Sequence, residues 1–267
     1  MPLSVCATPI GNLDDVTLRV LAELRSAAVV LCEDTRRTRI LLGRHEIPAT
    51  GLLSYHEHNE AKRTTELLPR LEAGERMALV SDAGMPGISD PGARLVAAAI
   101  AAGIPVTVLP GPSAVDTALV ASGFPAERYQ FVGFLPRGSG ALAALWEELA
   151  AWPHPVVAFE APQRLPVTLR SLAHAAPGRQ VAVCRELTKR FEEVVRGAAQ
   201  DVAERFAEPP KGEITLVLGP GTVEVAPSGA VTAVAELVAA GLSRRRAAEI
   251  VARLTGISRN DLYNRTL

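Results

Sequence analysis

Short apolar runs alternate with amphipathic stretches through the first half of the chain. The runs do not alternate apolar and polar residues, which is typical of parallel strands buried on both faces. They predict strands at 4–9, 28–34, 76–82 and 104–111. Helical spacing in between predicts helices at 16–27, 91–103 and 112–123, the first capped by Asp14 or Asp15. This order indicates a mostly parallel sheet covered by helices on both faces.

The pattern changes after residue 123 but remains α/β. Strands are predicted at 129–136, 155–162, 179–187 and 213–220, with helices at 141–152, 165–175 and 198–208. The turn Gly123-Phe124-Pro125 and the segment 219–230, rich in Gly, Pro and Ser, are the natural boundaries. The domains are therefore predicted at 1–123, 124–220 and 228–267.

Three short helices are predicted in the last domain, at 231–241, 242–256 and 258–267. Ser243 and Ser258 are suitable N-caps, and Asp261 completes a capping-box pattern with Ser258. Their spacing is that of a small helix–turn–helix appendage.

Composition indicates a well-packed globular chain of 267 residues, 48% of them hydrophobic, with a net charge of −1. We see no targeting segment and no membrane span, so we expect a soluble, cytoplasmic protein. Cys6, Cys32 and Cys184 are predicted to be buried, reduced thiols, and no metal-ligand spacing joins them to a histidine.

Positive charge is concentrated in two places. Residues 241–267 contain six arginines and only two acidic residues. A second group of basic residues consists of Arg36, Arg37, Arg39 and Arg44. Such patches are expected on a surface that contacts nucleic acid, although an exposed helix face rich in arginine has the same composition.

Three loops that follow strands contain the candidate ligand chemistry: 8–15, 80–92 and 109–114. Neither a dinucleotide fingerprint nor a Walker P-loop occurs in them. Asp82 can accept hydrogen bonds, and Gly84 and Gly87 allow a flat group to approach the backbone. A nucleoside-like ligand with little negative charge, such as S-adenosylmethionine, fits these residue types. Tight turns whose glycines serve only packing fit them too.

Eight ordered motifs between Thr8 and Leu218 carry a resemblance: TPIGNLDDVTLR, CEDTRRT, YHEHNE, LVSDAGMPGISDPG, LPGPSA, GFLPR, RELTK and KGEITLVL. Together with the tail LSRRRAAEIVARLTGISRNDLYNRTL, they resemble the ribosomal RNA small-subunit methyltransferase I family, within the tetrapyrrole methylase superfamily. The resemblance implies two α/β domains of the class III methyltransferase type and a C-terminal helical appendage. It also implies a homodimer that uses S-adenosylmethionine to 2′-O-methylate a cytidine in the decoding centre of 16S rRNA.

The resemblance also implies the residues that bind the cofactor. They are Pro9, Ile10, Gly11, Asp82, Ala83, Gly84, Met85, Ser113, Ala114, Phe159, Glu160, Gly212 and Ile214. Met85 departs from an expected threonine, and Ala161 and Gln163 depart from the usual Y-E-S-P-H-R motif.

No general base can be selected from the sequence. The candidates are Glu33, Asp34, His56, Asp82 and Glu213. For each of them, the residue type alone favours a capping or ion-paired role over a catalytic one. For phosphate contacts we expect Arg36, Arg37, Arg39, Arg244, Arg245 and Arg246. Two alternatives stay open: a tetrapyrrole or diphthamide-type methyltransferase, and a non-catalytic nucleic-acid-binding regulator.

Overall fold

The computed structural model describes residues 2–49, 51–221 and 227–266. Contacts divide the chain into two compact units: residues 1–144 with 154–220, and residues 145–153 with 221–267. The first unit contains two five-stranded sheets, and we call each sheet with its helices a lobe. The second unit contains the C-terminal helices and is described by itself.

The sheet of the first lobe is entirely parallel, with strand order β3-β2-β4-β1-β5. Its strands are β1 (Leu3–Cys6), β2 (Val29–Cys32), β3 (Leu52–Ser54), β4 (Met77–Val80) and β5 (Val106–Leu109). Its helices are α1 (Leu18–Ser26), α2 (Thr35–Arg44), α3 (Glu60–Glu72) and α4 (Ala93–Ala101).

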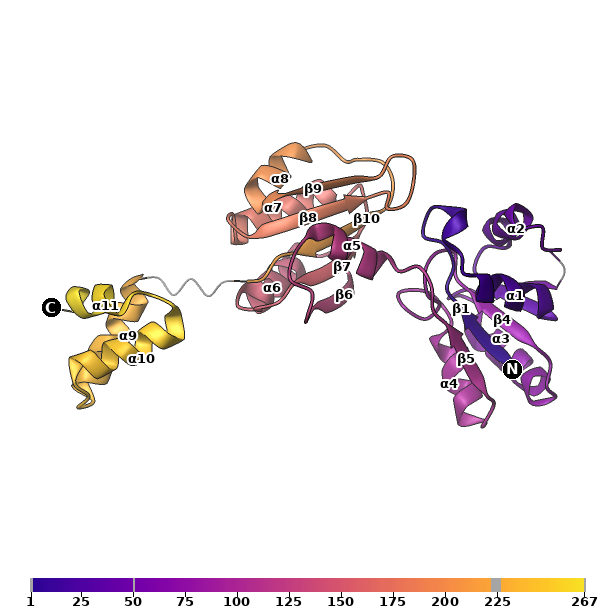
Figure 1. Ribbon diagram of the computed structural model, residues 1–267, viewed down its shortest axis with the longest axis horizontal. Helices are drawn as coiled ribbons and strands as arrows, with labels where there is room; N and C mark the ends of the chain where they lie inside the picture. Colours follow the sequence, from indigo (N-terminus) through magenta and orange to yellow (C-terminus); the bar gives the residue numbers. More distant parts are fainter. Residues whose placement is uncertain (1, 50, 222–226, 267) are drawn as a thin grey trace. The chain divides into compact units, whose positions relative to one another are not determined.

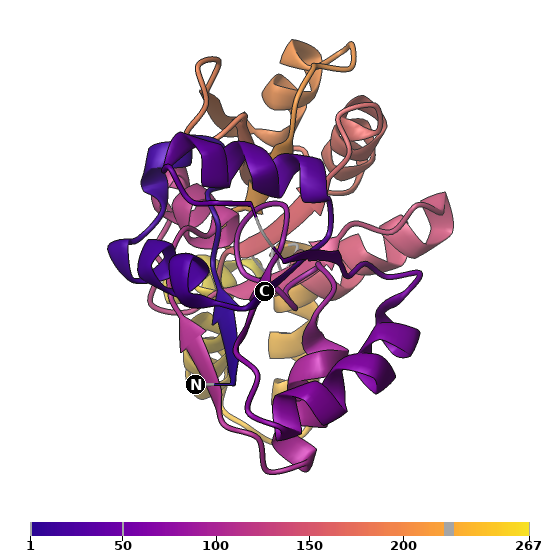
Figure 2. The same cartoon turned by 90° about the vertical axis from the view of Figure 1, so that its right-hand side faces the viewer.

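Alternate residues of these strands enter two separate cores. Cys6 and Cys32 pack with leucines of α1 and α2, whereas Leu3 and Leu31 pack with leucines of α3 and α4. Helices therefore cover both faces of the sheet, as Figures 1 and 2 show. This burial on both faces is why the strands read as continuous apolar runs, and the predicted parallel sheet is confirmed.

The second lobe has a mixed sheet of order β6-β7-β10-β8-β9. Only β6 and β7 pair in parallel, and the other neighbours are antiparallel. Its strands are β6 (Gln130–Phe134), β7 (Val156–Glu160), β8 (Gln180–Arg185), β9 (Glu193–Ala198) and β10 (Ile214–Leu218). The helices along this stretch are α5 (Ala114–Ser122), α6 (Ser139–Ala150), α7 (Leu165–Ala175) and α8 (Ala199–Arg205).

Helix α5 belongs to the second lobe by its packing. Its Val115, Ala118 and Leu119 enter a core with Val157 of β7 and Val217 of β10. A boundary at residue 123 would assign α5 to the first lobe, although its apolar face is buried by the second sheet. We therefore propose that the boundary precedes α5, between β5 and Ser113.

One helix start differs from the sequence prediction. Asp14 and Asp15 lie inside a short 3-10 turn, Leu13–Asp15, whose N-cap is Asn12. Val16 is extended, so α1 begins only after Thr17, whose hydroxyl accepts a hydrogen bond from the Val20 N–H at 3.2 Å. The prediction that Asp14 or Asp15 caps α1 is wrong, because the intervening turn uses those residues.

The C-terminal unit contains α9 (Pro227–Ala239), α10 (Arg244–Thr255) and α11 (Arg259–Arg265). Ser243 caps α10 as predicted, and Gly256 ends the helix in the left-handed conformation. Ser258 occupies the N-cap position of α11, but its side chain makes no capping hydrogen bond. The three helices share a small core of their own, formed by Ala230, Val234, Ala247, Ala248, Val251 and Leu262.

Two further expectations concern the described part of the chain. Cys6, Cys32 and Cys184 are buried and free, as predicted. No described helix is both long enough and apolar enough to cross a membrane.

Candidate active site

A cavity of about 320 Å³ lies where the loops of the first lobe meet the second sheet, and we call it the first cavity. This volume falls in the range of about 300–1,000 Å³ typical of small-molecule sites. Its lining is mostly apolar and comes from both lobes: Ile10, Ala83, Gly84, Met85, Ile88, Ser89, Asp90, Ser113, Ala114, Val115, Phe134, Phe159, Glu160, Ala161, Pro162, Cys184, Leu187, Gly212, Glu213, Ile214 and Thr215.

The loop after β4 forms one wall of the first cavity, with Ala83, Gly84, Met85, Ile88, Ser89 and Asp90. Gly84 exchanges two backbone hydrogen bonds with Thr8, at 2.8 and 2.9 Å, and has a φ of +75°. At the end of the loop, a Cβ on Gly92 would lie 2.9 Å from Leu79 Cδ2. Glycine is needed at Gly84 for conformation and at Gly92 for conformation and space, so these two residues hold the loop against the cavity.

The other two predicted loops complete this edge. Ile10 follows β1 and packs with Val115 and Leu119 of α5. Ser113 caps α5 by accepting a hydrogen bond from the Asp116 N–H at 3.3 Å. The three loops singled out in the sequence therefore do lie on one rim.

A second cavity of about 270 Å³ adjoins the first and shares Ile10, Ala83 and Glu213 with it. Its other lining residues are Thr8, Pro9, Gly11, Leu13, Arg37, Thr38, Ile40, Leu41, Ser81, Asp82 and Lys189. It is the more polar of the two, because two cations, two carboxylates and three hydroxyl groups line it.

Acidic partners hold both cations of the second cavity. Arg37 Nε lies 3.5 Å from Asp82 Oδ2. Lys189 Nζ donates to Glu186 Oε1 and to Glu213 Oε2, each at 2.8 Å. The second cavity is therefore nearly balanced in charge.

The predicted cofactor residues divide between the cavities. The first cavity is lined by Ile10, Ala83, Gly84, Met85, Ser113, Ala114, Phe159, Glu160, Gly212 and Ile214. Pro9, Gly11 and Asp82 line the second cavity instead. At Gly11 a Cβ would lie 2.5 Å from Lys189 Cγ, so this glycine serves the close packing of the two lobes.

Asp34 and Asp82 follow β2 and β4 and are joined by a hydrogen bond. Asp34 caps α2 and binds Arg36 at 2.7 Å, so the pKa of its carboxyl group falls to about 2. Its backbone N–H donates to Asp82 Oδ1 at 2.9 Å. Of these two candidates, only Asp82 lines a cavity.

Glu33 and His56 lie beside this pair and line neither cavity. Burial, followed by the charge of Asp82, raises the pKa of Glu33, while Arg37 and His56 oppose the rise. His56 Nε2 lies 3.1 Å from Asn59 Nδ2, and its Nδ1 is buried without a hydrogen-bond partner in the described part of the chain.

Asp90 is a cavity residue that the sequence analysis did not select. Burial raises its pKa to about 6, with a smaller contribution from the charge of Glu33. The available signal was its position in the same glycine-rich loop, directly before Pro91. Cys184 also lines this cavity, and burial raises the pKa of its thiol to about 11, so it stays neutral.

The three departures from the family pattern have different surroundings. Met85 lines the first cavity and also packs against the core beneath α3 and α4. Ala161 lines the same cavity, whereas Gln163 is exposed and lines neither cavity.

The predicted phosphate-binding arginines are mostly exposed. Arg36, Arg37 and Arg39 lie on α2, and Arg245 and Arg246 lie on α10. Arg244 differs, because its guanidinium lies 4.5 Å from the ring of Tyr263 and donates to the Tyr263 carbonyl, which joins α10 to α11.

Comparison with known proteins defines the class. Residues 2–203 match the family of tetrapyrrole (corrin/porphyrin) methylases, and residues 225–267 match the RsmI C-terminal HTH domain. A structure of uroporphyrin-III C-methyl transferase from Thermus thermophilus, complexed with S-adenyl homocysteine, has the same fold. It superposes with a TM-score of 0.57 at 19% identity, covering 81% of this chain and 96% of that one. The chain is a methyltransferase of the tetrapyrrole methylase class, whose methyl donor is S-adenosylmethionine.

Proteins related in sequence identify the family within this class. The ribosomal RNA small subunit methyltransferase I of Mesorhizobium japonicum is 42% identical over 268 residues, covering 99% of this chain and 91% of that protein. The Mycobacterium bovis protein of the same name is 45% identical over 264 residues, covering 98% and 93%. The chain belongs to the ribosomal RNA small subunit methyltransferase I family.

The first cavity fits the donor chemically. Apolar walls suit an adenine ring, and Ser89, Ser113 and Thr215 supply hydroxyl groups near it. No lysine, arginine or histidine is among its described lining residues, so nothing there favours a polyphosphate. Within the described residues, no group of three or more His, Cys, Asp or Glu side chains is placed to hold a metal ion.

Proposed function

We propose that this methyltransferase modifies the 2′-oxygen of a cytidine in the decoding centre of 16S rRNA. The observation that carries the proposal is the pair of adjoining cavities with a shared wall of Ile10, Ala83 and Glu213. The first cavity suits the donor and the second suits the acceptor nucleoside. The family relatives named as ribosomal RNA methyltransferases support RNA as the acceptor.

The charge balance of the second cavity supports a nucleoside acceptor. Arg37 and Lys189 are already paired with carboxylates, so the interior offers mainly hydrogen-bond donors and acceptors for a ribose. Phosphates are better placed outside, where Arg39 is exposed on α2 and where Arg36, although bound to Asp34 at 2.7 Å, has a side chain that is 84% exposed.

The bound donor supplies an activated methyl group and a good leaving group. The chain then has to align the acceptor hydroxyl, exclude water and accept a hydrogen bond from that hydroxyl. Of the five candidate bases, Asp82 and Glu213 line the second cavity, and only Glu213 lines both. We therefore assign the hydrogen bond from the acceptor hydroxyl to Glu213.

We extend the proposal to the partners of the chain. It acts as a homodimer on small ribosomal subunits in the cytoplasm, and its C-terminal helices contact the RNA. The arginines of α10 and the match to an HTH domain support the RNA contact. Light scattering in solution tests the dimer, and a mass equal to one chain would refute it.

The acceptor is tested with labelled S-adenosylmethionine and small subunits that lack the modification. We expect label in 16S rRNA, recovered as 2′-O-methylcytidine after digestion and mass spectrometry. Label on a base, or none in the RNA, would overturn the proposed acceptor.

A further inference from the structure

The first cavity has an acidic lining without an accompanying cation. Three carboxylates line it, from Asp90, Glu160 and Glu213, and none of its described lining residues is basic. An apolar cavity with excess negative charge favours a ligand that carries positive charge, because burying an unpaired carboxylate is unfavourable.

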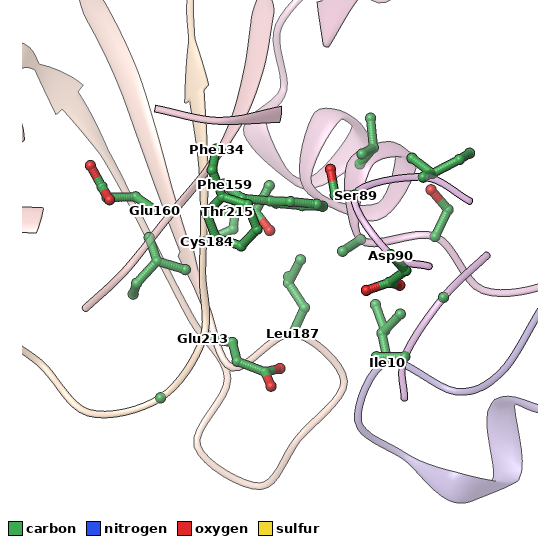
Figure 3. Close-up of a pocket in the computed structure, with 18 of the residues that line it drawn as sticks. Ile10, Ser89, Asp90, Phe134, Phe159, Glu160, Cys184, Leu187, Glu213 and Thr215 are labelled. Atoms are coloured by element: carbon green, nitrogen blue, oxygen red, sulfur yellow. The ribbon is translucent and has the colours of Figure 1, made fainter. Parts of the chain in front are cut away.

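Two of the three carboxylates already have partners. Glu160 accepts hydrogen bonds from Thr168 Oγ1 at 2.5 Å and from the Ala161 N–H at 2.7 Å, and Arg164 lies 3.3 Å away. Its carboxylate points away from the cavity in Figure 3. Glu213 is held by Lys189 at 2.8 Å.

Asp90 differs from both. Its carboxylate points into the cavity in Figure 3, and no cation of the described residues lies within ion-pair distance of it. The charges that act on it are those of Glu33 at the end of β2 and Asp82 at the end of β4, both acidic, while the Ser81 side chain lowers its pKa. Arg37, whose charge acts on Glu33, is itself paired with Asp82 at 3.5 Å.

We propose that the Asp90 carboxylate recognises the positive charge of the methyl donor and so distinguishes the donor from its demethylated product. S-adenosylmethionine carries one more positive charge than S-adenosylhomocysteine, because methyl transfer converts a sulfonium into a neutral thioether. A carboxylate in a mostly apolar cavity interacts more strongly with that charge than it would in bulk solvent. The same residue thus favours binding of the donor over binding of the product.

The proposal predicts how donor binding depends on pH. The pKa of Asp90 is raised to about 6, mainly by burial. A bound cation favours the ionised carboxylate and lowers this pKa, so donor binding near pH 6 releases a proton. Donor affinity is therefore complete above this pH and weakens as the pH falls below it. The neutral product should depend much less on this titration.

The test is calorimetric titration of the full chain, without RNA, with S-adenosylmethionine and S-adenosylhomocysteine. For the unmodified chain we expect donor affinity to fall about tenfold between about pH 7.5 and pH 5, and product affinity by less than about threefold. In Asp90→Asn, donor affinity at about pH 7.5 should fall about tenfold, lose its pH dependence and leave product affinity nearly unchanged.

Two matched variants separate charge from shape. Asp90→Glu keeps the charge and should restore the preference for donor over product. Glu33→Gln changes a residue outside the cavity that raises the pKa of Asp90, so the pH dependence should remain and its midpoint should move to lower pH.

Asp90→Asn with the unmodified donor-to-product ratio and pH dependence would overturn the proposal. An equal loss of donor and product would also overturn it, because it would assign Asp90 to the shape of the loop. The inference rests only on the donor part of the proposed function. Tight donor binding with no RNA methylation would refute the acceptor alone, whereas absence of donor binding by the unmodified chain would refute the proposed function itself.

Discussion

The two cavities share one wall but differ in charge. No lysine, arginine or histidine lies among the described residues lining the first cavity, whereas Arg37 and Lys189 line the second and are each paired with an acid. This difference suits a cationic donor in the first cavity and, in the function that we propose, a neutral ribose attached to phosphates in the second. Because the two cavities share only Ile10, Ala83 and Glu213, substitutions of other lining residues can change one cavity while leaving the other intact.

The largest effect is expected at the shared wall. In Glu213→Gln the acceptor hydroxyl loses its carboxylate partner, so kcat should fall about 100-fold with donor affinity nearly unchanged. The pair with Lys189 contributes little to stability, since the Glu213 side chain is 61% exposed. Single-turnover methylation and donor titration measure the two quantities.

Glu186→Gln is the matched control for this variant. It alters the other partner of Lys189, which also lies at 2.8 Å, but lines neither cavity. It should keep kcat within about threefold of the unmodified chain. An equal fall in kcat for both variants would assign the effect to Lys189 and remove Glu213 from the reaction.

Removal of residues 228–267 should be the next largest effect. These residues include the three C-terminal helices with their own core and the arginines of α10. We expect KM for small subunits to rise at least about tenfold at physiological salt, since phosphate contacts are lost. The donor Kd, measured by calorimetry, should not change. A weakened donor Kd would contradict the assignment of donor binding to the α/β body.

The fold was largely predictable because the first sheet is buried on both faces. Its strands stand out as uninterrupted apolar runs, and their parallel arrangement follows from the helices between them. The placement of α5 was not predictable in the same way. The apolar residues of α5 could pack against either sheet. Only their contacts with Val157 and Val217, which are distant in sequence, show which sheet buries the helix.

The candidate site, too, was predictable from the sequence only in part. Glycine-rich loops identified the rim, because positive φ at Gly84 and crowding at Gly92 require that residue type. Asp90 could not be selected from the sequence, since its raised pKa comes from burial and from Glu33, which is distant along the chain. Nor could the sequence separate residues that line the first cavity from Pro9 and Asp82, which line only the second.

A bulky side chain at the second cavity should impair the acceptor alone. Ile40 lines this cavity on α2 and is 62% exposed, so Ile40→Trp should leave the fold intact. We expect KM for small subunits to rise about fivefold to tenfold, with an unchanged donor Kd. The control is Leu18→Trp, at an apolar helix position that is 84% exposed and lines neither cavity. Equal KM values for the two variants would exclude the second cavity as the acceptor site.

The smallest effect on binding is expected at Met85, where the chain departs from its family. Met85 lines the first cavity, but it also packs against the core that contains Leu79 and Leu95. Met85→Thr removes apolar contacts from that core, so the free energy of unfolding should fall by about 1 kcal/mol. The donor Kd should change by less than about threefold, because the other apolar lining residues of the first cavity are unchanged. Thermal unfolding and calorimetry measure these two effects separately. A tenfold change in the donor Kd with unchanged stability would instead place the Met85 side chain against the donor.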